Sequence, residues 1–180
     1  PLIRTRLVLA LLALPTLLLA REPDPPALDP LKPLDRFIID LWTESDGLPQ
    51  NMASAIAQTP DGFLWLGTEE GLVRFDGADF HVFRAAETPG LPTSSVSALH
   101  ADADGTLWIG TRGGGLARLS EGEFTAYGVG DGLADSHIVA IFRDHDDMLW
   151  VGTAAGLSRM VGERFETFEA EGALAQARIL

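Results

Sequence analysis

The sequence predicts an all-β fold assembled from a repeated four-stranded unit, and two observations lead to this prediction. One phrase, TPDGFLWLGTEEGLVRF at residues 59–75, returns as DADGTLWIGTRGGGLARL and again as DHDDMLWVGTAAGLSRM. The tryptophans of these copies, Trp65, Trp108 and Trp150, are 43 and 42 residues apart. A fixed period of this length is typical of an array of small structural repeats.

Within one copy, short stretches alternate between apolar and polar residues and end at Gly or Asp, which indicates strands. The first copy gives Ala53–Gln58, Phe63–Thr68, Leu72–Asp76 and Phe80–Phe83. A repeated four-stranded antiparallel unit of about 40 residues is typical of a β-propeller blade. We therefore predict a β-propeller over residues 36–180, with blades at about 47–83, 90–127 and 132–168. Because a closed ring takes about four to eight blades, we expect a partial ring of about three to three and a half blades, within a longer protein.

The recurring residues have physical roles in this unit. Asp61, Asp104 and Asp146 lie in turns, where a short side chain hydrogen-bonds its own backbone and tolerates a left-handed conformation. Asp147 replaces a glycine in the third copy, so we expect strain in that turn. The tryptophans are expected to bury their rings between blades, beside glycines that allow close approach. Aromatic pairs at a spacing of three place rings on opposite faces of each outer strand: Phe80 and Phe83, Phe124 and Tyr127, Phe165 and Phe168.

The first 35 residues predict export. Arg4 and Arg6 precede an apolar run from Leu7 to Ala20, which is the pattern of a secretory signal peptide over residues 1–20. The run is shorter than the roughly 20 residues that span a bilayer, so an uncleaved anchor is the alternative. Residues 21–35 are rich in proline and are predicted to form a stiff linker.

Both ends of the periodic region indicate further blades. Residues 36–42 resemble an outer strand that has no inner strands before it, so we predict that this segment completes the last blade of a ring. Residues 172–180 restart the pattern, with Leu174 aligned to Leu133 and Ile179 to Ile138. We predict that they begin a fourth blade.

Composition argues against several other classes of protein. The formal charge of −13 is unfavourable for a nucleic-acid or anionic-lipid partner, and the absence of cysteine rules out disulfides and thiolate zinc sites. The histidines have no metal-like spacing. Asp102/Asp104 and Asp144/Asp146 recur at equivalent turns, as structural rather than catalytic carboxylates do. We predict no catalytic residue, no metal and no cofactor in this segment.

The stretch GLPQNMASAIAQTPDGFLWLGTEEGLVRFDGADFHVF, residues 47–83, resembles the two-component regulator propeller repeat. The second copy departs from it by one inserted residue in RGGG, and the third has Ala134 in place of proline. This family forms the extracytoplasmic sensor part of bacterial membrane receptors, with a histidine kinase or a diguanylate cyclase as output. The resemblance therefore implies a periplasmic segment of an inner-membrane protein, and a homodimeric full-length receptor.

We expect function where the copies differ. Glu69, Glu70 and Arg112 lie in the loop after Gly-Thr, where charge changes from copy to copy, and they are the predicted contacts for a small-molecule or saccharide-type ligand. On this hypothesis the segment is a sensor and not an enzyme, and its partners include the missing blades and the output domain of the same chain. The alternatives are a free periplasmic propeller enzyme, similar to a lyase or glycosidase, and a protein-interaction scaffold.

Overall fold

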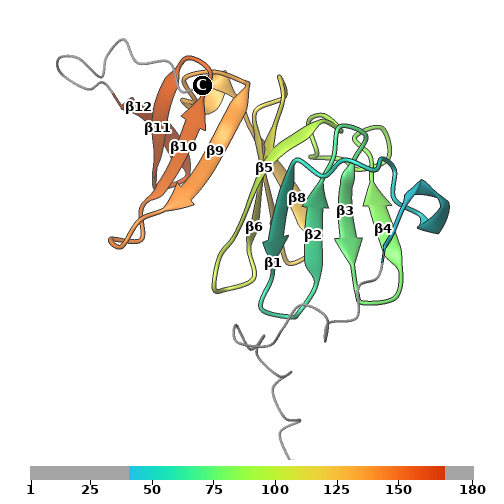
Figure 1. Ribbon diagram of the computed structural model, residues 1–180. Helices are drawn as coiled ribbons and strands as arrows, with labels where there is room; N and C mark the ends of the chain where they lie inside the picture. Colours follow the sequence, from blue (N-terminus) through green and yellow to red (C-terminus); the bar gives the residue numbers. More distant parts are fainter. Residues whose placement is uncertain (1–40, 169–180) are drawn as a thin grey trace, which may run out of the picture. The chain divides into compact units, whose positions relative to one another are not determined.

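The computed structural model describes residues 41–168 of the chain. In this range three antiparallel sheets of four strands each follow one another, and we call them blades 1, 2 and 3 (Figure 1). Blade 1 consists of β1 (Ala55–Gln58), β2 (Leu64–Gly67), β3 (Leu72–Phe75) and β4 (Phe80–Phe83). Blade 2 consists of β5 (Val96–Ala101), β6 (Leu107–Thr111), β7 (Leu116–Ser120) and β8 (Glu123–Tyr127). Blade 3 consists of β9 (Ile138–Arg143), β10 (Leu149–Thr153), β11 (Gly156–Val161) and β12 (Arg164–Phe168). Short 3-10 segments, η2 (Glu44–Asp46) and η3 (Val129–Asp131), precede blades 1 and 3.

Each blade is a meander in which consecutive strands are hydrogen-bonded neighbours, so the predicted four-stranded antiparallel unit is confirmed. The register is also repeated, because the tryptophan of the second strand pairs with an arginine of the third strand in every blade. The structure begins β1 at Ala55, two residues after the predicted start at Ala53. Ser54 stands directly before β1, and its hydroxyl donates to the carbonyl of Val96 in blade 2 at 2.6 Å as well as within its own sheet.

Left-handed residues occupy the turn between the first two strands of every blade. Gly62 and Gly105 have φ of 94° and 92°, and Asp147 takes the same place in blade 3 with φ of 63°. The expected strained turn at Asp147 is therefore present, since a residue with a Cβ adopts a conformation that favours glycine. The left-handed conformation falls on the residue after the turn aspartate, and not on the aspartate itself as the sequence had indicated.

Hydrogen bonds in these turns correct one predicted role. Asp104 Oδ1 accepts the backbone N–H of Thr106 at 2.9 Å, as expected of a turn aspartate. In blade 3 the accepting carboxylate is Asp144, which takes the N–H groups of Asp146 and Met148, both at 2.9 Å. The role predicted for Asp146 therefore belongs to Asp144, and Asp146 is one of the two donors.

The hydrophobic core lies between successive blades, where glycine lets the sheets approach. A Cβ on Gly67 would lie 2.6 Å from Cγ1 of Val96, and one on Gly110 would lie 2.6 Å from Cγ2 of Ile138. Each pair joins the second strand of one blade to the first strand of the next. Trp65 is buried beside Gly67, as predicted, with 5% of its surface exposed.

The outer-strand aromatic residues continue this packing. Phe83 stacks on Trp65 within blade 1, with ring centroids 5.7 Å apart, and also contacts Phe124 of blade 2 at 5.7 Å. Tyr127 contacts Phe165 of blade 3 in the same way, at 5.5 Å. One ring of β4 and one ring of β8 therefore contact the next blade, as the spacing of three predicts.

Trp42 makes the equivalent contact with blade 1. Its ring lies 6.2 Å from Phe80 and 5.0 Å from Phe75, so it occupies the place that the outer strand of a preceding blade would fill. Most of the closing strand predicted at 36–42 lies outside the described residues. The predictions for residues 1–20, 21–35 and 172–180 lie outside them as well.

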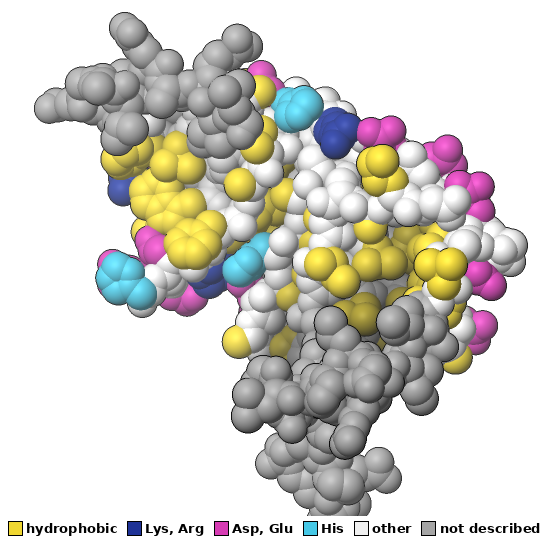
Figure 2. Space-filling view, viewed as in Figure 1, with side chains coloured by type: hydrophobic (Ala, Val, Ile, Leu, Met, Phe, Trp, Pro, Cys, Tyr) yellow, Lys and Arg dark blue, Asp and Glu magenta, His cyan; other side chains and the backbone are white. Residues whose placement is uncertain are grey.

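The far face of blade 3 is apolar and exposed. Trp108 is 3% exposed beneath blade 3, whereas Trp150 is only partly buried. Phe142 and Phe168 on the same face are 62% and 43% exposed, and hydrophobic side chains gather over this part of the molecule (Figure 2). Within residues 41–168 no further blade covers this face. The observed arrangement is therefore a partial propeller.

Candidate functional site

The loops that follow the Gly-Thr pairs lie at the end of the blades where the innermost strands begin. In blade 1 the buried Thr68 hydroxyl donates to the carbonyl of Gly71 at 2.9 Å and accepts the N–H of Glu70 at 3.2 Å. These bonds fix a tight loop and turn the side chains of residues 69 and 70 outward, where both are exposed. The threonine of the motif thus shapes the loop on which the predicted ligand contacts lie.

Two of the three predicted contacts meet each other across the boundary between blades 1 and 2. The guanidinium of Arg112 donates to Oε1 of Glu69 at 2.7 Å, although the two residues are 43 positions apart. Both side chains are about half exposed, at 45% and 52%, so the ion pair contributes little stability, on the order of 1 kcal/mol or less. Among residues 41–168, Glu70 forms no hydrogen bond or ion pair with either of these side chains. Their role as ligand contacts stays a prediction.

Neighbouring loops hold this ion pair in place through the backbone. The N–H of Glu69 donates to the side-chain carbonyl of Gln50 at 3.2 Å. The N–H of Arg112 donates to the carbonyl of Ser95 at 2.9 Å, and Arg112 also forms an isolated β-bridge with His137 of blade 3. Loops from all three blades therefore converge around Arg112, at an end of the molecule where a ligand could exchange for a weak, solvated ion pair.

The innermost strands lie next to one another, so these loops share one end of the blades. β1 contacts β5, and β5 contacts β9. Ser54 donates its hydroxyl to Val96 of the next inner strand, and Ser97 does the same to the carbonyl of Ile138 at 2.7 Å. The repeated hydroxyl bond sets the distance between adjacent inner strands.

Asp102 links two blades, a role that its turn position did not reveal. Its carboxylate accepts the indole N–H of Trp108 at 2.8 Å and Nε of Arg143, from blade 3, at 2.6 Å. Partial burial disfavours ionisation, but the bonds from Arg143 and Trp108 outweigh it and hold the pKa of Asp102 below its ordinary value. The sequence signal for the bond to tryptophan is a polar residue six positions before it. Thr59 and Asp144 occupy this position in the other two blades, and each accepts the indole N–H of its own blade's tryptophan.

No metal centre is evident in the part of the chain that the structure describes. Within residues 41–168 there is no group of three or more His, Cys, Asp or Glu side chains placed to hold a metal ion. His100 lies 3.2 Å from Asp102, where it neighbours an inter-blade ion pair. His81 is exposed on β4, as its strand position predicts.

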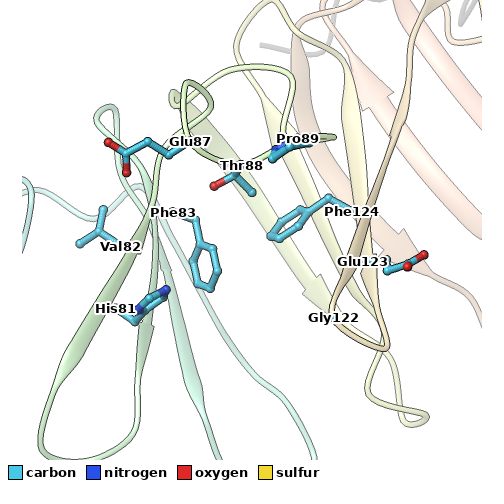
Figure 3. Close-up of a pocket in the computed structure, with 9 residues that line it drawn as sticks. All are labelled: His81, Val82, Phe83, Glu87, Thr88, Pro89, Gly122, Glu123 and Phe124. Carbon is cyan, nitrogen blue, oxygen red and sulfur yellow. The ribbon is translucent and has the colours of Figure 1, made fainter.

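A groove that the sequence reasoning missed runs between the outer strands of blades 1 and 2. One part of it has a volume of about 570 Å³, and the rings of Phe83 and Phe124 project toward each other across it (Figure 3). Its residues come from β4, from the following loop at residues 87–89, from the β7–β8 turn and from the start of β8. Glu69, Glu70 and Arg112 are not part of its lining. No single repeat could have indicated it, because each wall belongs to a different copy.

Comparison with known sequences identifies the repeat. The sequence profile of the two component regulator propeller matches residues 47–70, 90–113 and 132–155. The chain contains three two component regulator propeller repeats. Each matched segment runs from a Gly-Leu pair through the loop after Gly-Thr, and so includes the loops that carry the candidate contacts. The two component regulator propeller resemblance seen in the sequence is confirmed.

Similar proteins extend this result. A histidine kinase from Formosa agariphila is 42% identical over 48 residues, which are 27% of this chain and 4% of the kinase. The extracellular domain of a putative hybrid two component system from B. thetaiotaomicron has a TM-score of 0.64 at 24% identity, over 73% of this chain and 18% of that chain. A virginiamycin B lyase from Staphylococcus aureus has a TM-score of 0.56 at 21% identity, over 72% and 45% of the two chains. The described residues therefore have the fold of a partial β-propeller, and the matched parts span 4% of the kinase and 18% of the extracellular domain.

Proposed function

We propose that this two component regulator propeller is the N-terminal, periplasmic, ligand-sensing part of a membrane-bound bacterial signalling receptor. Its output, a histidine kinase or a diguanylate cyclase, follows in the longer protein. The observation that carries the proposal is the triple match to a repeat named for two-component regulators. The likeness in fold to an extracellular domain of a putative hybrid two component system supports the same role.

The N-terminal sequence supports export. Arg4, Arg6 and the apolar run Leu7–Ala20 have the order of a secretory signal, which supports a location outside the cytoplasm. Within residues 41–168 the structure contains no helix with the length and apolarity that crossing a bilayer requires. We propose that the propeller lies in the periplasm and reaches the inner membrane through other segments of the full-length protein.

The proposed sensing surface is the loop end around Arg112. A ligand with an acidic or polar oxygen can replace Glu69 as the partner of Arg112 at small cost, because the existing pair is half exposed. Loops of three blades meet there, so binding changes how the blades contact one another. Signalling then requires a ligand whose affinity differs between the two states of a receptor dimer.

Translation of the gene downstream of Leu180 tests the proposal. The expected result is further Trp-x-Gly-Thr blades, then a hydrophobic span of roughly 20 residues and a kinase or cyclase domain. Alkaline phosphatase fused after residue 168 should be active in cells, and the same fusion without residues 1–20 should be inactive. A stop codon soon after the last blade, or an inactive full-length fusion, would contradict the proposal.

A free propeller enzyme is the second candidate. The fold similarity to virginiamycin B lyase supports it, since that enzyme aligns over 72% of this chain. This candidate requires a catalytic cluster supplied by blades beyond the described ones. A downstream sequence that ends with the ring and carries no membrane span would favour the enzyme, or a protein-interaction scaffold, over the receptor.

A further inference from the structure

The groove between the outer parts of blades 1 and 2 has the dimensions of a small-molecule site. Its second part, with a volume of about 450 Å³, shares His81, Phe83, Gly122 and Phe124 with the part shown in Figure 3. Cavities of about 300 to 1,000 Å³ accommodate small organic ligands. The groove is independent of the loop end where sensing is proposed, and a site here would exist in a receptor and in a free propeller alike.

Polar and apolar side chains share the walls of this second part. Phe63, Trp65, Phe83 and Phe124 line it together with two leucines. The guanidinium of Arg74 also lines it and lies over the ring of Phe63, 4.6 Å from the centroid. The remaining charged or titratable lining residues are Asp61, His81 and Glu121.

The boundary between blades 2 and 3 is an internal control, because the same positions there are bridged by two ion pairs. In the first pair, Arg143 of blade 3 binds Asp102 of blade 2 and also approaches Asp147 at 3.5 Å. In the second pair, Arg118 of blade 2 lies 4.0 Å from Glu163 of blade 3. Side chains of the chain itself therefore occupy this boundary.

The first ion pair is lost completely at the boundary between blades 1 and 2. Ala101 stands in the place of Arg143, since each pairs with the first residue of the next strand, and Thr59 stands in the place of Asp102. The third exchange is in the turn, where Gly105 stands in the place of Asp147. Three short residues therefore stand at this boundary where the next one has three charged residues. The boundary between blades 1 and 2 therefore lacks the side chains that bridge the next boundary, and Thr59 and Gly105 line the groove there.

Of the second ion pair, only the acidic residue is replaced at the boundary between blades 1 and 2. Arg74 occupies the same register as Arg118, opposite the tryptophan of its blade, so the cation is retained. Gly122, in the β7–β8 turn, stands where blade 3 has Glu163. The boundary between blades 1 and 2 thus keeps a guanidinium at a cavity with aromatic walls and lacks the carboxylate that stands at the position of Glu163 in the next repeat.

We propose that this groove binds a small monocarboxylate with an apolar, ring-sized body. The ligand carboxylate takes the place of Glu163 and pairs with Arg74, which forms charge-assisted hydrogen bonds with carboxylates. The body lies against the rings of Phe83 and Phe124, which flank the groove. Asp61 and Glu121 on the rim repel a second negative charge, so a dianion is disfavoured.

Binding of three probes to the full chain tests the charge preference. Isothermal titration with phenylacetate, benzyl alcohol and benzylamine at one ionic strength compares an anion, a neutral molecule and a cation with the same ring. We expect phenylacetate to bind about tenfold more tightly than benzyl alcohol, and benzylamine to bind most weakly. Tighter binding of benzylamine, or no binding of phenylacetate, overturns the proposal.

Variants locate the site. Arg74→Gln should abolish the preference for phenylacetate over benzyl alcohol while benzyl alcohol still binds, a result that misfolding does not produce. Arg118→Gln is the matched control and should leave the preference within twofold, and Arg74→Lys should restore part of it. The double variant Thr59→Asp/Ala101→Arg copies the bridge of the next boundary into the groove and should abolish binding of both probes. An unchanged preference in Arg74→Gln places binding elsewhere and refutes the proposal.

Discussion

Replacement of Asp102 by asparagine tests how strongly the ion pair between blades 2 and 3 stabilises the molecule. The carboxylate side chain is 10% exposed and that of Arg143 is 25% exposed, so neither group is fully solvated. Asparagine keeps the shape and can still accept the indole N–H of Trp108, but its amide does not pair with a guanidinium. Hydrogen bonds to charged groups contribute about 1.5 to 3 kcal/mol each, and loss of one member leaves the other partly buried. We expect the free energy of unfolding to fall by about 2 to 3 kcal/mol.

Urea denaturation of four proteins measures the coupling between the two residues. These are the parent, Asp102→Asn, Arg143→Gln and the double variant, and they form a double-mutant cycle. A coupling free energy above about 1 kcal/mol is expected for partners in direct contact. If the two single effects simply add in the double variant, the ion pair does not join the blades energetically and the reasoning is refuted.

The pH dependence gives a second measure of the same bond. The pKa of Asp102 in the folded chain lies below its ordinary value, since Arg143 and Trp108 outweigh partial burial. The stabilisation is therefore fully present above the unfolded-state pKa of about 3.9 and is lost as the pH falls through the folded-state pKa. The stability difference between the parent and Asp102→Asn should be constant near pH 7 and shrink below about pH 4.

Three further substitutions follow from the packing. Gly67→Ala should lower the free energy of unfolding by about 1 to 3 kcal/mol, measured by denaturation, because its Cβ would lie 2.6 Å from Val96. Thr68→Val should cost about 1 to 3 kcal/mol, since it removes the buried hydroxyl that shapes the loop after the Gly-Thr pair. Trp65→Ala should cost about 3 to 5 kcal/mol, and Trp150→Ala distinctly less, because within residues 41–168 a following blade covers Trp65 and not Trp150.

Matched positions provide the controls. Gly128→Ala should be close to neutral, because no atom lies within 4 Å of its added Cβ. Thr125→Val on the exposed side of β8 should change stability by less than about 0.5 kcal/mol. Equal costs for Trp65→Ala and Trp150→Ala would contradict the interpretation that blade-on-blade burial, and not the tryptophan alone, carries the stability.

Most of the fold was predictable from the sequence repeat. Period-two alternation and turn residues act within a few positions along the chain, so the four strands of each blade and their order were predictable from one copy. Recurrence of Trp65 in the two later copies was enough to indicate an array. The turns were predicted less well, because two aspartates stand at each of the later turns and Asp104 accepts the backbone N–H in one turn but Asp144 in the next.

The contacts of the candidate sites were less predictable from the sequence than the fold was. The loop charges Glu69 and Arg112 were selected because the copies differ, but their ion pair joins residues 43 positions apart and required the tertiary structure. Asp102 looked like a turn residue, and only the adjacent blade revealed Arg143 as its partner.

The sequence by itself determined that this chain forms four-stranded blades, because strands and turns are encoded by neighbouring residues and three copies repeat the code. Only the tertiary structure decided what lies between the blades. Arg74 and Arg118 occupy the same position of the repeat, yet one borders a groove between two blades and the other faces Glu163. The physical reason is that each boundary is formed by two different copies, so its charge and volume depend on pairs of residues that no single repeat contains.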